Sequence, residues 1–598
     1  MVKKAISDSI YMLSLIHKKN KWFIPLKILI IIIDCLKLLI NTLYIKFIVD
    51  AMISKTIDDV FIIVTIIQIS FFILSLLINL LEKRVLERMQ FKIQNELQND
   101  FIKQATKHDL QCYEDYDFYN SFTKAMRVAD NKAISILNNI TSLISSVFSI
   151  ILLGSVIGVL DYVLMFFIVI MIISSSIDTI LSNHVSMELY DASEIINRQA
   201  EYLKRVAHHH DFAKEVRAYN LFDFLRKKLN VAFNEKFKMF KITNKKYWNI
   251  KLIFSIINSL IISTTLLLYL AYMTMNGHFT IGEFTMLFGA VFTLAGYMAN
   301  IINVFSNLNF ESKYYISNLR KILDYQPKIE NSGTLSIDST KQHTIEFKNV
   351  SFTYPNSNNK AINNVSFKIN VNEKVAIVGR NGSGKSTIIK LLLRLYDVDS
   401  GEILLDNINI KEYNVYDLRA CFSTIFQDYK IYAFTIAENI MLNENINSSL
   451  IDESLKYVDL YDKIQSCKFQ ANTYVTKEFD ENGVNFSGGE LQKIAIARAY
   501  VNNCSTMILD EANSALDPIA DYEMTTKMIN QMNDKMVIFV SHRLNSIVNV
   551  EKILVFKDGV LVESGKHEEL LKNKSLYYEM YSRQKNAMES YEMLKAYE

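Results

Sequence analysis

Cysteine is scarce in this chain, and its spacing gives no sign of a metal site or a disulfide framework. The 598 residues contain five, at Cys35, Cys112, Cys421, Cys467 and Cys504. Scattered thiols of this kind are typical of reduced, packed side chains. The sequence also has no basic run with interleaved aromatic residues, which argues against nucleic-acid binding. A net charge of +2 specifies no partner.

The length and hydrophobicity indicate more than one structural part. A chain of 598 residues is too long for one core, half of its residues are hydrophobic, and only 21% are charged. This composition predicts a membrane part joined to a globular part. The first apolar segment is full length and no small-residue cleavage site follows it, so we expect no cleavable signal peptide.

The N-terminal half has six apolar segments long enough to cross a bilayer, which takes about 20 residues each. They lie near 22–45, 60–81, 136–160, 162–181, 252–275 and 284–308. The third and fourth are separated by little more than Asp161 and should form a hairpin. We therefore predict an all-α transmembrane domain of six helices over 22–310, after a short cytoplasmic segment, 1–21.

Basic residues predict the orientation of these helices. The two long loops, 82–133 and 183–251, are rich in lysine and arginine, whereas the short loops have almost none. Basic loops stay in the cytoplasm. Both termini and both long loops should then be cytoplasmic, in a multi-pass protein of the plasma membrane, with Trp22 and Trp248 at the membrane edge.

A glycine-rich loop near the middle of the chain predicts a phosphate-binding site. It follows an apolar strand, Val375–Val378, and opens an apolar-periodic helix, as phosphate chemistry requires. We expect Lys385 to reach the β and γ phosphates and Ser386 to hold Mg²⁺; a glycine turn without a ligand is the alternative. The loop and the residues beside it are Gly379, Asn381, Gly382, Ser383, Gly384, Lys385, Ser386 and Thr387.

Two further apolar strands deliver candidate catalytic residues. Thr506–Leu509 leads to Asp510 and Glu511, an arrangement in which the aspartate can bind the Mg²⁺ shell and the glutamate can polarise an attacking water. Met536–Val540 leads to His542, at the strand end where ligands of open α/β sheets collect. A solvated loop end and a structural histidine are the alternative interpretations.

A second motif, Phe486–Glu490, completes the pattern, and together these residues resemble the nucleotide-binding domain of the ABC transporter family over about 344–571. The resemblance implies an α/β P-loop domain, here 344–580, that binds ATP with Mg²⁺. It also implies that Tyr354 stacks on adenine, that Gln427 senses Mg²⁺ and the γ-phosphate, and that Ser386, Gln427 and Asp510 surround the metal. By the same resemblance Ser487, Gly488 and Gly489 contact the ATP of a second domain, and Asp517 lies in a dimer-contacting loop.

The sequence departs from the family pattern at three places. Phe486 and Glu490 replace the usual leucine and glutamine of the second motif, and activity should survive because both flank its phosphate-contacting core. The stretch 478–483 lacks the Val-Gly-Glu that is common in exporters. The role of this stretch in coupling ATP hydrolysis to transport is therefore less secure. Ala512 and Asn513 replace a common Pro-Thr pair, which we interpret as neutral.

The two long loops have helical periodicity, so the spanning helices should continue into the cytoplasm, as in ABC exporters. The resemblance implies that each loop ends in a short helix that docks on a nucleotide domain. The matching stretches are 114–124, anchored by Tyr116, Phe118 and Tyr119, and 211–222. Amphipathic surface helices without a partner are the alternative. A linker, 311–343, and a C-terminal tail, 581–598, complete the chain.

Three features of the membrane part and its loops carry weaker signals. Asp34 lies within the first span, with Lys37 one turn on; it either faces a water-filled cavity or is neutralised locally by that lysine. Gly154 and Gly158 favour ordinary packing over a special helix contact. The consecutive histidines 208–210 would point in three directions on a helix, so a metal site is not expected there.

One chain supplies six spans and one nucleotide domain, so the resemblance requires a second half-transporter, a homodimer or a heterodimer. We expect ATP hydrolysis to drive export, with membrane lipid around the helices and no nucleic acid. The sequence variants and the lack of an N-terminal peptidase domain favour a mature peptide as substrate. A lipid or multidrug exporter is the alternative, and a membrane ATPase that regulates or conducts without pumping is a third class.

Overall fold

The computed structural model describes residues 2–596 except 56–58, 258–261, 330, 332, 356, 444, 503, 512–517 and 533. It divides into two compact units, which are described separately. One comprises 1–108 and 116–325, and the other comprises 109–115 and 326–598. Ala512, Asn513 and Asp517, for which the sequence made predictions, lie outside the described residues.

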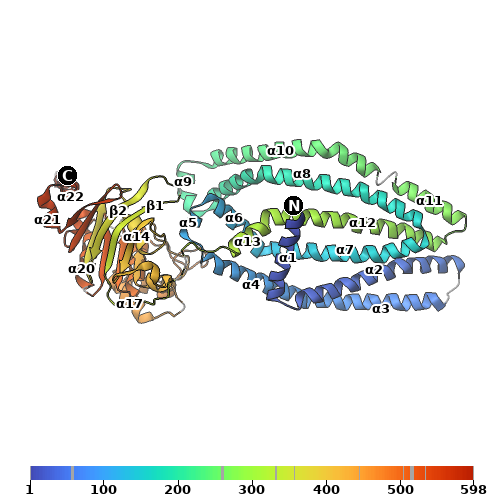
Figure 1. The fold of residues 1–598 in the computed structure, drawn as a ribbon, viewed down its shortest axis with the longest axis horizontal. Coiled ribbons are helices and arrows are strands. Elements are labelled where there is room, and N and C mark those ends of the chain that lie inside the picture. Colours follow the sequence, from blue (N-terminus) through green and yellow to red (C-terminus); the bar gives the residue numbers. More distant parts are fainter. Residues whose placement is uncertain are drawn as a thin grey trace. The chain divides into compact units, whose positions relative to one another are not determined.

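The first unit is entirely helical. Its main helices are α1 (Val2–Lys19), α2 (Phe23–Ser54), α3 (Asp59–Leu81), α4 (Glu87–Ala105), α6 (Tyr116–Arg127), α7 (Ala133–Leu160), α8 (Tyr162–His208), α9 (Ala213–Ala218), α10 (Phe222–Ile256), α11 (Ser263–Met275), α12 (Ile281–Glu311) and α13 (Ser317–Leu323). The long helices run alongside one another, and α1 lies across them (Figure 1). Short π-helical turns, Glu82–Leu86, Val128–Lys132 and Ser312–Ile316, join the spans to their extensions.

Four helical stretches in the described part of the chain are long and apolar enough to cross a membrane by length and composition. They are Asp59–Ala105, Ala133–Leu160, Tyr162–His208 and Ile281–Leu323, and they contain the second, third, fourth and sixth predicted spans. The first predicted span lies in α2, outside these four. The fifth includes 258–261, outside the described residues. These two spans stay predictions.

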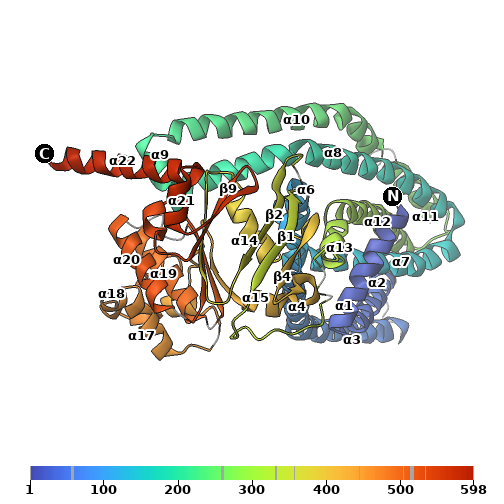
Figure 2. The ribbon, with the colours of Figure 1, turned by 60° about the vertical axis from the view of Figure 1, so that its left-hand side comes forward.

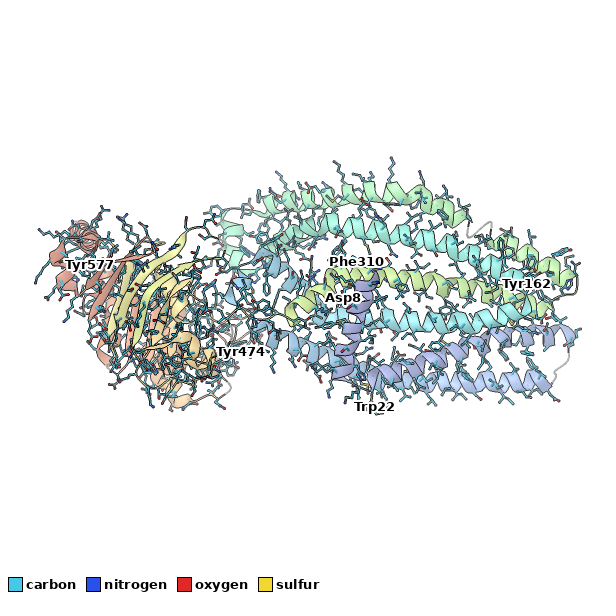
Figure 3. All side chains as sticks on the ribbon, viewed as in Figure 1. Asp8, Trp22, Tyr162, Phe310, Tyr474 and Tyr577 are labelled. Atoms are coloured by element: carbon cyan, nitrogen blue, oxygen red, sulfur yellow. The ribbon has the colours of Figure 1, made fainter. Side chains whose placement is uncertain are left out.

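The helices of the first unit enclose two hydrophobic cores, and α1 crosses the other helices at a buried polar contact. Leu153, Leu266 and Leu287 belong to one core, between α7, α11 and α12. Where α1 crosses the bundle, the buried Asp8 accepts a hydrogen bond of 2.5 Å from Ser312 Oγ. Asp8 and Phe310 lie close to this crossing, and Trp22 and Tyr162 mark opposite ends of the apolar helices (Figure 3).

The second unit contains two sheets. A four-stranded antiparallel sheet has the order β2 (Lys360–Ile369), β1 (Ile345–Thr353), β4 (Ser400–Leu405), β5 (Ile408–Asn409). A six-stranded sheet has the order β10 (Val560–Gly565), β9 (Lys552–Lys557), β3 (Lys374–Gly379), β8 (Met536–Val540), β7 (Thr506–Asp510), β6 (Phe422–Ile425). All its pairs are parallel except β9–β10. Figure 2 shows both sheets beside the helices of this unit.

The helices of the second unit are α5 (Leu110–Tyr113), α14 (Lys385–Leu392), α15 (Val415–Ala420), α16 (Ile436–Met441), α17 (Ser448–Tyr457), α18 (Tyr461–Gln465), α19 (Gly488–Val501), α20 (Pro518–Gln531), α21 (His567–Asn573) and α22 (Leu576–Ala596). Every residue of β3, β7 and β8 is buried, as expected for parallel strands covered on both faces. Because β3, β8, β7 and β6 are neighbours and parallel, the residues that follow their carboxyl ends meet at one edge of the sheet.

In the first long loop, the segment Asp109–Asp115 belongs to the second unit and overlaps the predicted docking stretch 114–124 at Glu114 and Asp115. Leu110 packs on the core beneath β1 and β3, whereas Phe118 packs inside the helical unit and Tyr116 and Tyr119 are exposed. Of the three predicted anchors only Phe118 packs on a hydrophobic core of its own unit, and docking of 116–124 on a nucleotide domain stays a prediction. In the second loop, α9 occupies part of 211–222, and its docking stays a prediction.

Candidate nucleotide-binding site

The phosphate loop connects β3 to α14 as the glycine pattern predicts. Gly382 and Gly384 have φ of 79° and 99°, a region that favours glycine. A Cβ on Gly384 would lie 2.8 Å from Ala361 O, so no larger residue fits without displacing the backbone. The loop therefore keeps the tight curvature that directs amide groups inward.

The polar groups of this loop are arranged for an anionic ligand. Lys385 Nζ donates to Gly379 O at 3.1 Å and Arg380 O at 3.2 Å, so the ammonium lies over the loop. Burial lowers the pKa of Lys385, and nearby Glu511 and Asp510 oppose that shift. Ser383 Oγ is buried and has no hydrogen-bond partner in the described part of the protein. A phosphate would supply the missing partner.

The metal ligands implied by the resemblance lie together. Ser386 Oγ donates to Asp510 Oδ1 at 3.3 Å, at the end of β7. Burial raises the pKa of Asp510, and the Ser386 hydrogen bond opposes this. Gln427, two residues after β6, donates from Nε2 to Glu511 Oε2 at 2.8 Å. A hydroxyl, a carboxylate and an amide oxygen are donors that suit Mg²⁺.

Glu511 and His542 form the second half of the site. His542 Nδ1 lies 3.5 Å from Glu511 Oε2, and the Glu511 side chain is 12% exposed. Glu511 has φ of 48°, in the left-handed region that costs a non-glycine residue about 1–2 kcal/mol. Its N–H donates to Val540 O at 2.9 Å, which holds this conformation between β7 and β8. The strained backbone fixes the carboxylate at the edge of the sheet.

Tyr354 stands near the loop on the antiparallel sheet. Its hydroxyl lies 3.2 Å from Thr387 Oγ1, and the half-buried ring meets Tyr396 edge-on at 5.4 Å between centroids. Lys390 Nζ lies 5.3 Å from the centroid of the Tyr354 ring and 3.7 Å from Glu114 Oε1. Sequence reasoning named Glu114 only as the start of the predicted docking stretch and missed Lys390, because the two residues are far apart in the chain.

The second motif forms the start of α19. Ser487 is the helix N-cap: its Oγ accepts from Glu490 N at 3.4 Å, and Glu490 Oε2 accepts from Ser487 N at 2.8 Å. Within the described residues, no hydrogen bond or ion pair joins Ser487, Gly488 or Gly489 to the phosphate loop. The structure thus brings together every described nucleotide-site residue except these three.

Comparisons with known proteins agree with this geometry. Residues 362–514 match a family model described as ABC transporter. An ATP-dependent lipid A-core flippase of Vibrio vulnificus (strain YJ016) is 35% identical over 323 residues, 54% of each chain. The Subtilin transport ATP-binding protein SpaT of Bacillus subtilis is 35% identical over 379 residues, 62% of this chain and 60% of that one. The chain thus spans little more than half the length of the curated relatives it matches.

A solved structure extends the likeness to both units. The structure of a bacterial Atm1-family ABC exporter with ATP bound has a TM-score of 0.77, covers 93% of this chain and 98% of its own, and is 21% identical. At that identity the match shows the fold. Residues 362–514 therefore match the ABC transporter family model, and the chain has the fold of the Atm1-family ABC exporter.

Proposed function

We propose that this chain is one half of an ATP-driven exporter and that it hydrolyses ATP to move a substrate out of the cell. The observation that carries the proposal is the assembly of Lys385, Ser386, Asp510 and Glu511 at one edge of the parallel sheet. These groups can bind a triphosphate and activate a water molecule. The relatives named as a flippase and as a transport protein support export.

The residues divide the chemistry between them. Lys385 and the loop amides bind the phosphates. Glu511 accepts the proton of the attacking water, and Gln427 and His542 hold this carboxylate in place through the contacts of 2.8 and 3.5 Å. When bound, Mg²⁺ neutralises charge on the phosphate oxygens; Ser386, Asp510 and Gln427 are its proposed ligands.

We propose a homodimer as the working assembly. Ser487 and its glycines cap α19 without touching the phosphate loop of the same chain, so a second chain has to bring them to the nucleotide. One sequence carries Glu511, His542 and Ser487 together, and two copies supply two complete sites. A heterodimer is the competing assembly. If the chain purified without any other chain hydrolyses ATP, a different partner chain is not required.

A mature peptide is the proposed substrate. The support is that the subtilin transport protein matches 62% of this chain, a longer stretch than the flippase match. The lipid exporter is the second candidate because several relatives are lipid A-core flippases. Mass spectrometry of the medium and of membrane lipids from cells with the parent or the Glu511→Gln protein separates the two.

The ATPase test uses the same substitution. Glu511→Gln should lower the ATP turnover rate by about 100- to 10,000-fold, the usual value of a positioned general base, while ATP still binds. The measurement is phosphate release by the purified full-length protein in lipid vesicles. Glu568→Gln, at an exposed glutamate of the same domain, is the matched control and should keep the parent rate. Turnover above about a tenth of the parent rate would contradict the role of Glu511.

The third class, a membrane ATPase that does not pump, is tested in the same vesicles. ATP-dependent accumulation of a peptide or labelled lipid on one side of the bilayer supports export. Hydrolysis of ATP without any vectorial movement would favour a regulator or channel instead.

A further inference from the structure

Polar residues of α2 face polar residues of α3 and of the π-helical turn Glu82–Leu86 that follows it. The helices α2 and α3 run side by side (Figure 1). Lys27 Nζ contacts Glu82 Oε1 at 2.5 Å, and Asn41 Oδ1 accepts from Gln68 Nε2 at 2.5 Å. Along α2 the two positions are fourteen residues apart, and along the antiparallel partner they are separated by the same interval in reverse. At these two positions of α2, a polar side chain is thus paired with one from the facing helix.

Asp34 lies midway between these two positions on α2, seven residues from each. Seven residues are two helical turns, so Lys27, Asp34 and Asn41 share one face. The position opposite Asp34 is Ser75, which is buried and donates its hydroxyl to Phe72 O at 2.8 Å. Ser75 therefore directs its hydroxyl hydrogen to its own helix, and no hydrogen bond joins it to Asp34 in the described part of the chain.

Asp34 has no ion-pair partner within 4 Å among the described residues. The charged groups that act on Asp34 electrostatically are Lys37, Glu82 and Lys27. Lys27 and Glu82 are engaged with each other. Lys37 interacts with Asp34 electrostatically, but the two side chains form no ion pair within 4 Å among the described residues.

The side chain of Asp34 is exposed although Ile30, Ile31 and Cys35 around it are buried. A carboxylate that faces lipid within a membrane span is costly, so such residues face protein or water-filled cavities. An exposed anion among apolar side chains attracts a positive charge, because the surrounding low dielectric strengthens the attraction.

We propose that Asp34 is a binding site for a positively charged group on the transported molecule. This inference rests on the proposed export function and narrows its substrate to a cationic amphiphile: the apolar face of α2 contacts its hydrophobic part, and the carboxylate contacts its basic group. Anionic lipids without a basic group are excluded from this site.

The test compares two hydrophobic ions of the same shape and opposite charge. The purified full-length protein in vesicles is titrated with tetraphenylphosphonium and, separately, with tetraphenylborate, and the ratio of stimulated to basal ATP hydrolysis is measured. The cation should stimulate the parent and the anion should not. Asp34→Asn should raise the half-stimulating cation concentration about tenfold, equivalent to about 1.4 kcal/mol, and Asp34→Glu should restore the parent response.

Gln68→Ala removes the neighbouring hydrogen bond to Asn41 and keeps the Asp34 carboxylate. This variant should respond to the cation as the parent does. Binding of radiolabelled tetraphenylphosphonium to each variant without ATP gives a second readout, independent of hydrolysis. The inference is overturned if Asp34→Asn keeps the parent response, if Gln68→Ala loses the response equally, or if hydrolysis proceeds in the parent without any cation effect. A parent that hydrolyses no ATP but binds the cation through Asp34 would refute the proposed function instead.

Discussion

At the scale of single residues, one lysine links two departures from the family pattern. Lys463 Nζ is bonded to Glu490 Oε1 and lies 5.7 Å from the centroid of the Phe486 ring. The hydrogen bond from Lys463 lowers the pKa of Glu490, as do its bonds to Ser487. Glu490 thus stays ionised at the start of α19, and Lys463 offsets a negative charge close to the proposed phosphate contacts.

We predict that Lys463→Met weakens ATP binding because it leaves Glu490 uncompensated. The KM for ATP should rise up to about fivefold, the range of an exposed ion pair, and the rise should shrink at high salt. Lys463→Met combined with Glu490→Gln should return the KM to near the parent value. Steady-state ATPase kinetics at two ionic strengths measure this, with Lys468→Met as a control that removes a nearby charge. Additive effects in the double variant would contradict the coupling.

Tyr354 provides a second residue-scale prediction. If its ring stacks on adenine, Tyr354→Ala should lose roughly 1–3 kcal/mol of ATP binding, and Tyr354→Trp should keep it. Tyr354→Phe is the control, because it removes only the hydroxyl that contacts Thr387 at 3.2 Å. The KM for ATP gives the result; identical values in all four proteins would make Tyr354 a purely structural aromatic.

At the scale of elements, α2 and α12 are fastened to each other at one end. Asp50 Oδ1 accepts from Gly282 N at 2.9 Å, and Asp50 Oδ2 accepts from Thr280 Oγ1 at 3.0 Å. Lys46 and Glu283 add an ion pair of 2.8 Å. A Cβ on Gly282 would lie 2.4 Å from Lys46 O and 2.5 Å from Asp50 Cγ, so the helices approach too closely for a side chain.

We expect Gly282→Ala to separate these helix ends, because backbone and a bonded carboxylate have to move. Overpacking of this kind costs typically about 1–3 kcal/mol. The melting temperature of the detergent-purified protein should fall, whereas Gly289→Ala, at a position in α12 with open space around it, should not lower it as far. Equal melting temperatures for the two variants would show that the contact is easily relaxed.

The sequence predicted the elements that depend on local pattern and missed those that depend on register. The loop around Lys385 and the strand before Asp510 are recognisable because spacing and hydrophobicity within one segment determine them. The pairing of Lys27 with Glu82 was not predictable, since it requires the alignment of two helices across a loop. The contact of Glu114 with Lys390 was not predictable for a similar reason, because it joins residues far apart in the chain.

At the scale of the whole molecule, the separation of Ser487 from Lys385 within one chain leads to a test of assembly. Ser487→Ala and Lys385→Ala should each lose most ATP hydrolysis. A mixture of the two in which chains exchange should regain activity, because one site of each mixed dimer then has both wild-type residues. Phosphate release before and after exchange measures this, and each variant incubated alone is the control. A mixture no more active than its components would contradict a composite site.

The position of α5 has a practical consequence for work on the second unit by itself. Asp109 accepts hydrogen bonds from Lys328 N at 2.7 Å and Ile329 N at 3.2 Å, while the partly buried Leu110 packs against the core of this unit. A fragment cloned from residue 326 onward would lack the segment 109–115, because this segment lies some two hundred residues upstream in the sequence. Such a fragment should expose the apolar surface that Leu110 covers. It should therefore aggregate more readily than a fragment in which 109–115 is restored through a short linker.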